Sequence, residues 1–147
     1  MALQKPWTCA KDSRWLLKTH PSFRLYAITD AKPRCATYIS RALTSSSISP
    51  PRPYWTDVKV CSKVVTNVYL PPTERSVAEE FLARLSRPRW LVVGDFNAKY
   101  PSWGAGTYAD PRGRRVADWA AERGLRPALR NEATYDQGGT LDLIFQG

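Results

Sequence analysis

The stretch WLVVGDFN, Trp90 to Asn97, decides the fold class, because a strand of apolar residues ends there on Gly-Asp-Phe-Asn. Trp90–Asp95 is apolar on both faces, which is typical of a central strand covered on each side. Asp95 ends that strand, and Asn97 follows two residues later. A carboxylate there can orient or deprotonate a water, and a carboxamide can donate to charge on a phosphoryl oxygen. The same four residues also favour a plain turn, which stays open at this point.

Strand and helix patterns surround this stretch. Short strands are predicted at Phe23–Thr29, Cys35–Ile39, Asp57–Val60, Lys63–Leu70 and Leu141–Phe145, with a turn near Cys61 and Ser62. A short helix is predicted within Lys11–Pro21, and the Ser- and Pro-rich run Thr44–Pro53 is predicted to be a surface loop. The order is therefore mixed α and β with hairpins, and neither a purely doubly wound sheet nor an all-β sandwich fits.

Two further helices are predicted from their end signals. The first follows Pro71-Pro72, with Thr73 as its cap, capping-box spacing between Ser76 and Glu79, and an apolar face that includes Phe81. The second opens at Asp110-Pro111, turns Val116, Trp119 and Ala120 inward, and closes at Gly124.

Composition narrows the class of protein. The chain has 147 residues, of which 43% are hydrophobic and six are Trp, so residues 1–147 are predicted to form a single packed domain. No apolar run approaches the roughly 18 residues of a membrane span, and no secretory signal opens the chain. An intracellular location is expected, nuclear if the protein acts on chromosomal DNA. The three cysteines form no CxxC and are predicted to be buried free thiols.

The net charge of +9 points to a polyanionic partner, most simply nucleic acid. A basic surface that serves solubility alone is the other reading. Aromatic and basic side chains in the second half could supply stacking and phosphate contacts: Tyr100, Tyr108, Arg112, Arg114 and Arg115. Trp103 lies in the same region and is expected to anchor its loop onto the core.

Four motifs occur in one order: NVYLPP, GDFNAKYPSWG, RGRRVADWAAERGL and ATYDQGGTLDLIF. In that order the sequence resembles the endonuclease domain of LINE-like, non-LTR retrotransposons, a branch of the endonuclease/exonuclease/phosphatase superfamily. The likeness runs from about Leu3 to Phe145 and is most specific from Asn67 onward. It implies an α+β four-layer sandwich of two mixed sheets flanked by helices, and Mg²⁺-dependent cleavage of a DNA phosphodiester that primes reverse transcription.

The resemblance also implies roles for individual residues. Asp95 would activate water, Asn97 would orient the phosphate, and Tyr69 would lie near the scissile phosphate. Asp142 would be the acidic residue that follows the substrate-binding threonine of the family, for which Thr134 is a loose match. From the residues alone, Tyr69 could instead be an ordinary strand aromatic, Asp142 an edge-strand charge and Thr134 a loop residue.

Three departures from the family pattern bear on activity. In LQKPW, Lys5 occupies the position at which related domains carry the glutamate that ligates Mg²⁺, and an ammonium has no lone pair to give a metal. The family's first strand and its closing Ser-Asp-His segment fall outside this sequence, so the domain is expected to be truncated at both ends. His20, the only histidine, stands far upstream and is expected to be structural or exposed.

Three functions follow as alternatives. The chain could be a metal-dependent DNA endonuclease with very low activity, or a non-catalytic remnant that binds nucleic acid electrostatically. It could also be a protein-interaction module that uses an exposed sheet edge.

Overall fold

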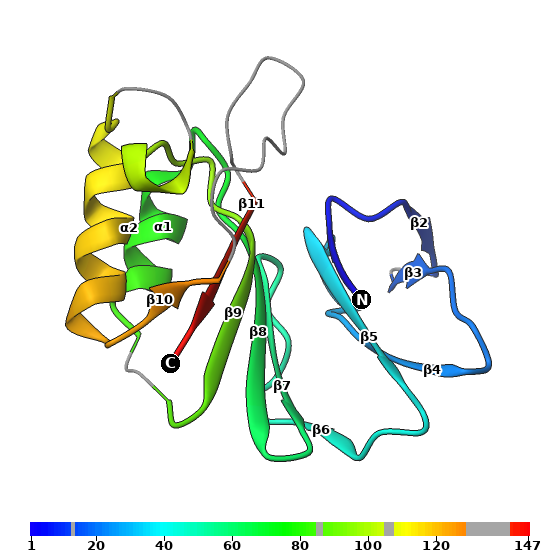
Figure 1. Cartoon of the computed structure of the whole chain (residues 1–147). Helices are drawn as coiled ribbons and strands as arrows, with labels where there is room; N and C mark the ends of the chain where they lie inside the picture. Colours follow the sequence, from blue (N-terminus) through cyan, green and yellow to red (C-terminus); the bar gives the residue numbers. More distant parts are fainter. Residues whose placement is uncertain (13, 85–86, 105–107, 129–141) are drawn as a thin grey trace.

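The computed structural model describes residues 1–12, 14–84, 87–104, 108–128 and 142–147. Within these ranges the chain has the predicted α+β fold, in which two sheets pack against each other and helices cover one of them (Figure 1). None of the helices in these ranges has the length and apolar character needed to cross a bilayer.

A six-stranded mixed sheet forms the larger layer. Its strands, in spatial order, are β10 (Arg126–Pro127), β11 (Asp142–Gln146), β9 (Trp90–Asp95), β8 (Lys63–Tyr69), β7 (Trp55–Val60) and β6 (Ser45–Ser47). Only β8 and β9 pair in parallel, and the other neighbours are antiparallel. The strand apolar on both faces, β9, lies between β8 and β11, as its sequence predicted.

The second sheet is antiparallel and has three strands, β1 (Ala2–Gln4), β5 (Cys35–Ser40) and β4 (Phe23–Tyr26), with β5 in the middle. It packs on the larger sheet through β5 on β7 and β8, and through β1 on β8 and β9. The interface between the sheets is partly polar. The hydroxyls of Thr37 and Thr56 lie 2.6 Å apart across it, and the buried side chain of Asn67 bonds to the backbone of both β1 and β5.

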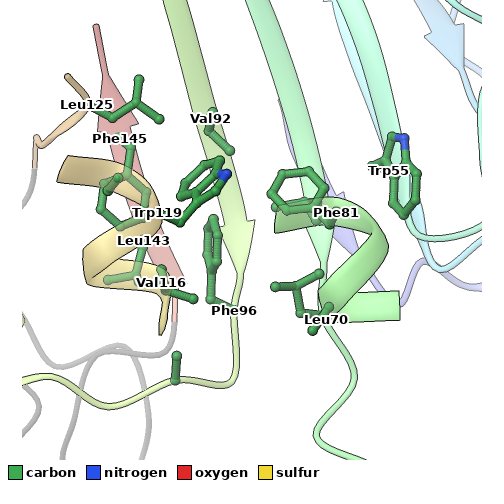
Figure 2. Close-up of a cluster of buried hydrophobic side chains, with 14 of the residues drawn as sticks. Trp55, Leu70, Phe81, Val92, Phe96, Val116, Trp119, Leu125, Leu143 and Phe145 are labelled. Atoms are coloured by element: carbon green, nitrogen blue, oxygen red, sulfur yellow. The ribbon is translucent and has the colours of Figure 1, made fainter. Parts of the chain in front are cut away.

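Helices α1 (Arg75–Leu82) and α2 (Pro111–Glu122) lie side by side on the face of the six-stranded sheet turned away from the smaller sheet (Figure 1). Aromatic side chains fill the layer beneath them. Figure 2 shows Phe96 and Trp119 between α2 and the strands β9 and β11, and the Phe96 ring meets Phe145 edge-on at 5.4 Å between centroids. Burial of large apolar and aromatic surface here is the main source of stability.

The helix ends agree only partly with the sequence signals. Asp110 caps α2 as predicted, because its carboxylate accepts a hydrogen bond from the Gly113 amide at 2.5 Å. The predicted cap of α1 is wrong: α1 begins at Arg75, its N-cap is Glu74, and no side chain caps it. Tyr54 explains the position of Glu74, since its hydroxyl donates to the Glu74 carboxylate at 2.6 Å.

Two segments differ from their sequence-based assignments. Where a helix was predicted, β2 (Thr8–Lys11) and β3 (Arg14–Leu17) form an antiparallel hairpin that turns at Asp12, whose φ is +49°. The partner strand satisfies the backbone groups of β3, and the Trp15 amide also donates to the Thr29 carbonyl at 2.8 Å. Within the predicted loop Thr44–Pro53, residues 45–47 form β6, because the edge of β7 offers unpaired backbone groups.

The cysteine prediction is correct in one respect and wrong in another. All three cysteines are free thiols. Cys35 is buried, but Cys9 and Cys61 are exposed. Cys61 lies at the tight turn between β7 and β8, where its φ is +52° and its side chain is exposed.

Candidate active site

Strand register brings three of the predicted site residues together at one end of the six-stranded sheet. Tyr69, the last residue of β8, stands opposite Asp95, the last residue of β9. Asp142, the first residue of β11, stands opposite Asp95 on the other side. The carboxyl ends of β8 and β9 and the amino end of β11 therefore place a phenol and two carboxylates in one row.

A close approach of two strands holds Asp95 in this row. A Cβ atom on Gly94 would lie 1.8 Å from the Val68 carbonyl oxygen, and Gly94 has a φ of +154°. Only glycine therefore lets β9 run so near β8 at this point.

Asn97 closes the turn that follows Asp95. Its backbone N–H donates to Asp95 Oδ1 at 2.9 Å, and its Nδ2 donates to the Leu70 carbonyl at 2.9 Å. Its φ of +45° is one that asparagine tolerates better than most residues. The turn expected from Gly-Asp-Phe-Asn is therefore present, and the catalytic roles of Asp95 and Asn97 stay predictions. The Asn97 side chain also hydrogen-bonds the Asp95 carboxyl and so helps to lower the pKa of Asp95.

Arg112 connects the two segments that follow β8 and β9. Its guanidinium donates to the backbone carbonyls of Leu70 at 3.3 Å, Pro71 at 2.8 Å, Phe96 at 3.5 Å and Pro72 at 3.1 Å. Burial lowers the pKa of Arg112, against the pull of the nearby Asp110 and Asp95 carboxylates. The side chain thus ties the chain after β8 to the chain after β9. This role was missed in the sequence, because the carbonyls of Leu70, Pro71 and Pro72 lie 40 to 42 residues away in the chain and that of Phe96 lies 16 away.

Lys5 reaches the site from the other sheet. It follows β1 with a φ of +49°, and its backbone N–H donates to the Arg34 carbonyl at 2.7 Å. Its Nζ lies over the Tyr69 ring, 4.9 Å from the centroid, which is a cation–π contact. The preceding residue, Gln4, donates to Asn67 Oδ1 at 2.8 Å and so fixes the end of β1 against β8. Lys5 therefore faces the row that contains Tyr69 and Asp95.

Opposing influences act on the Asp95 carboxyl. Burial raises the pKa of Asp95 above its usual value, and the Asp142 carboxylate raises it further. The Asn97 amide and the Lys5 ammonium pull the same pKa down, but less than burial raises it. A carboxyl whose pKa is raised is a better proton acceptor when it is ionised, which suits a residue that orients or deprotonates water.

The donor set fits a resident Mg²⁺ poorly. Mg²⁺ prefers oxygen ligands in near-octahedral geometry, and the neighbouring Lys5 Nζ supplies positive charge instead of a lone pair. Among the described residues no three His, Cys, Asp or Glu side chains lie together. We therefore derive no chemical step through a metal.

The other predicted residues that the structure describes have contacts of their own. Arg114 donates to the Ala109 carbonyl at 2.7 Å, Arg115 pairs with Glu79 at 3.4 Å, and Tyr100 packs on Trp103 at 5.1 Å between centroids. Tyr108 is 58% exposed. Their roles in binding nucleic acid stay predictions, and Thr134 lies outside the described residues.

Two expectations about single side chains agree with the structure. Trp103 is buried, as expected of a loop anchor. The exposed His20 accepts a hydrogen bond from the Ser22 amide at 3.2 Å and lies far from the site in the chain.

Comparison with known proteins agrees with this picture. A family described as endonuclease-reverse transcriptase matches residues 64–147, the part that contains Tyr69, Asp95, Asn97 and Asp142. The solved endonuclease domain of TRAS1, a telomere-specific non-LTR retrotransposon, superposes with a TM-score of 0.66 at 18% identity. The match covers 86% of this chain and 68% of that one, and it shows a shared fold. No curated protein matches the chain significantly. Because the family match covers more than half of the chain, this chain belongs to the endonuclease-reverse transcriptase family.

Proposed function

We propose that this domain binds DNA at the end of the six-stranded sheet and cleaves it very weakly. One observation carries the proposal. The Lys5 ammonium lies over the Tyr69 ring, close enough to Asp95 for its charge to lower the pKa of that carboxyl. The family membership and the fold shared with a retrotransposon endonuclease domain support DNA as the ligand. The net charge of +9 supports the same ligand. A nuclear location would follow if chromosomal DNA is the target.

Lys5 changes which ligand the row of Tyr69, Asp95 and Asp142 can bind. A divalent cation 4 Å from an ammonium is repelled by about 8 kcal/mol at an effective dielectric constant of 20. That value is an upper bound, because a lysine side chain can swing toward water. A phosphate group, in contrast, would accept hydrogen bonds from the same ammonium. The substitution therefore favours binding of the DNA backbone over binding of the metal that the family resemblance implies.

The second candidate is a working endonuclease, and the register of Tyr69, Asp95 and Asp142 favours it. Nicking of supercoiled plasmid in the presence of Mg²⁺ separates the two. We expect the unmodified chain to nick only slightly faster than Asp95→Ala. Rapid nicking by the unmodified chain that Asp95→Ala abolishes would show that the site is fully active and would refute the proposal.

Lys5→Glu and Lys5→Gln test the role of the ammonium. Lys5→Glu supplies a ligand, whereas Lys5→Gln only removes the charge. Calorimetry should detect Mg²⁺ binding to Lys5→Glu and weaker or no binding to Lys5→Gln. Strong Mg²⁺ binding by the unmodified protein would contradict this explanation.

The affinity of the unmodified protein for duplex DNA, measured across a salt series, should fall steeply as the salt concentration rises.

A further inference from the structure

A second feature, beside the site but distinct from its row of carboxylates, is the exposed indole of Trp7. Trp7 is 78% exposed, the largest fraction among the large apolar side chains of the described residues. It lines a pocket of about 300 Å³ together with Lys5, Thr8, Lys32 and Arg34. Burying an indole removes a large apolar area from water, so a ligand that covers Trp7 would gain free energy of binding.

The walls of this pocket are held by backbone hydrogen bonds. The Lys5 amide donates to the Arg34 carbonyl at 2.7 Å, and the Arg34 amide donates to the Pro53 carbonyl at 2.7 Å. Just below, Gln4 pairs with Cys35 in the β1–β5 ladder. Pro6 and Pro33 stiffen the two segments further. The pocket is therefore formed before any ligand arrives, which lowers the entropic cost of binding.

The charge of the pocket selects an anion. Three basic residues, Lys5, Lys32 and Arg34, line the pocket together with Trp7, and no carboxylate is among its described lining residues. The Lys32 Nζ lies 5.3 Å from the Trp15 ring centroid, so an aromatic contact positions it. A flat aromatic face with cations around it is the arrangement by which proteins hold unpaired bases and their phosphates.

We propose that this pocket binds single-stranded nucleic acid, with one base stacked on Trp7 and the flanking phosphates on Lys32, Arg34 and Lys5. A paired base has both faces covered by its neighbours in the duplex, so only an unpaired base can offer a face to the indole. The inference rests on the proposed function in that both take nucleic acid as ligand. Lys5 borders both places, because its Nζ lies over Tyr69 and the residue also lines the Trp7 pocket.

The test measures binding of a fluorescein-labelled ten-residue oligo(dT) and of a duplex of equal length by anisotropy. Stacking on one aromatic side chain corresponds to a loss of about 5- to 150-fold in affinity when the ring is removed. We expect Trp7→Ala to lose that much for the single strand and little for the duplex, and Trp7→Phe to keep most of the affinity. Leu43→Ala removes another exposed apolar side chain and serves as the matched control.

The charge of the pocket is tested by the same anisotropy measurement on Lys32→Glu. Lys59→Glu, which makes the same change at an exposed position on β7, is the control. Only Lys32→Glu should lower single-strand affinity several-fold beyond the general electrostatic effect. Unlabelled oligo(dT) should also quench tryptophan emission, and Trp7→Phe should remove most of the quenching. Equal single-strand affinity of Trp7→Ala and the unmodified chain, or quenching that survives Trp7→Phe, would overturn the inference.

Failure of this inference can be told apart from failure of the proposed function. If Trp7→Ala leaves single-strand binding unchanged while salt-sensitive duplex binding persists, only the pocket assignment fails. If single-strand binding depends on Trp7 while the plasmid is nicked rapidly and Asp95→Ala abolishes that nicking, the pocket stands and the proposal of weak cleavage fails. Capture of an acidic peptide with higher affinity than the oligonucleotide would assign the pocket to a protein partner and overturn the inference.

Discussion

The Nδ2 atom of Asn67 donates a hydrogen bond to the Ala36 carbonyl at 3.0 Å and so joins the two sheets. The same atom donates to the Leu3 carbonyl at 3.3 Å, and Oδ1 accepts from Gln4 at 2.8 Å. Asn67 is completely buried. One carboxamide therefore satisfies polar groups of β1 and β5 from β8, at the place where Lys5 leaves β1.

Asn67→Leu is expected to lower the free energy of unfolding by about 1–3 kcal/mol, because the Ala36 carbonyl and the Gln4 amide lose their partner inside the interface. Urea denaturation measures the change. Gln146→Leu, an exposed amide on β11, serves as the control and should change stability by less than about 0.5 kcal/mol. A cost for Asn67→Leu no larger than that of the control would show that the sheets hold together without this bond.

Asp57 and Arg84 form a buried ion pair on the helix-covered side of β7. The Asp57 side chain is 1% exposed, and it also accepts hydrogen bonds from Thr66 at 2.6 Å and Ser49 at 3.0 Å. Arg84→Met should destabilise the domain by about 3–5 kcal/mol, because the carboxylate stays buried without its cation. Thermal or urea unfolding measures it. Arg84→Met combined with Asp57→Leu should recover part of the loss, and no recovery would contradict the ion-pair explanation.

Asp95→Asn should change how stability depends on pH. Because burial raises the folded-state pKa of Asp95, its stabilising contribution is present below the unfolded-state pKa of about 3.9 and is lost as pH rises through the folded value. Asp95→Asn removes this penalty, so it should be more stable than the unmodified chain at pH 7, with the difference shrinking toward pH 3. If Asp95→Asn is instead less stable than the unmodified chain at pH 7, and this difference disappears at low pH, folding lowers the pKa of Asp95 and does not raise it.

Gly94→Ala should destabilise the sheet by about 3 kcal/mol or more, because the added methyl carbon would meet the Val68 carbonyl oxygen at 1.8 Å. Gly124→Ala is the matched control. Gly124 also has a positive φ, +64°, but a Cβ there would meet nothing within 4 Å. It should cost only about 1–2 kcal/mol, the backbone strain alone. Equal costs at the two glycines, measured by urea denaturation, would rule out the close approach of β8 and β9.

The thiols should differ in reactivity. Burial, reinforced by the nearby Asp57, raises the pKa of Cys35 far above its usual value, and its Sγ lies 3.7 Å from the Asn67 carbonyl. A thiol reagent at pH 8 should therefore modify two thiols, Cys9 and Cys61, in the native protein. The third should react only after unfolding. Rapid modification of three thiols in the native state would show that the interface between the sheets opens.

Local patterns in the sequence were sufficient for several elements. The apolar run of β9, the Cys61 turn between β7 and β8, and the Asp110 cap of α2 each combine neighbouring residues that favour one conformation, and each is present. The hairpin of β2 and β3 was not predicted, because what favours a strand there is its partner strand. Exposure of Cys9 likewise depends on that hairpin.

By itself the sequence determined the α+β class, the central strand that ends on Asp95, the basic charge and the lysine at position 5. These properties reside in residue types and in neighbours along the chain. The tertiary structure alone decided that this lysine lies over Tyr69, that Arg112 bonds to the carbonyls of Leu70, Pro71 and Pro72, and that an exposed Trp7 shares a pocket with three basic residues. Such contacts join residues far apart in sequence, and their geometry is set by sheet register and layer packing, which no local pattern encodes.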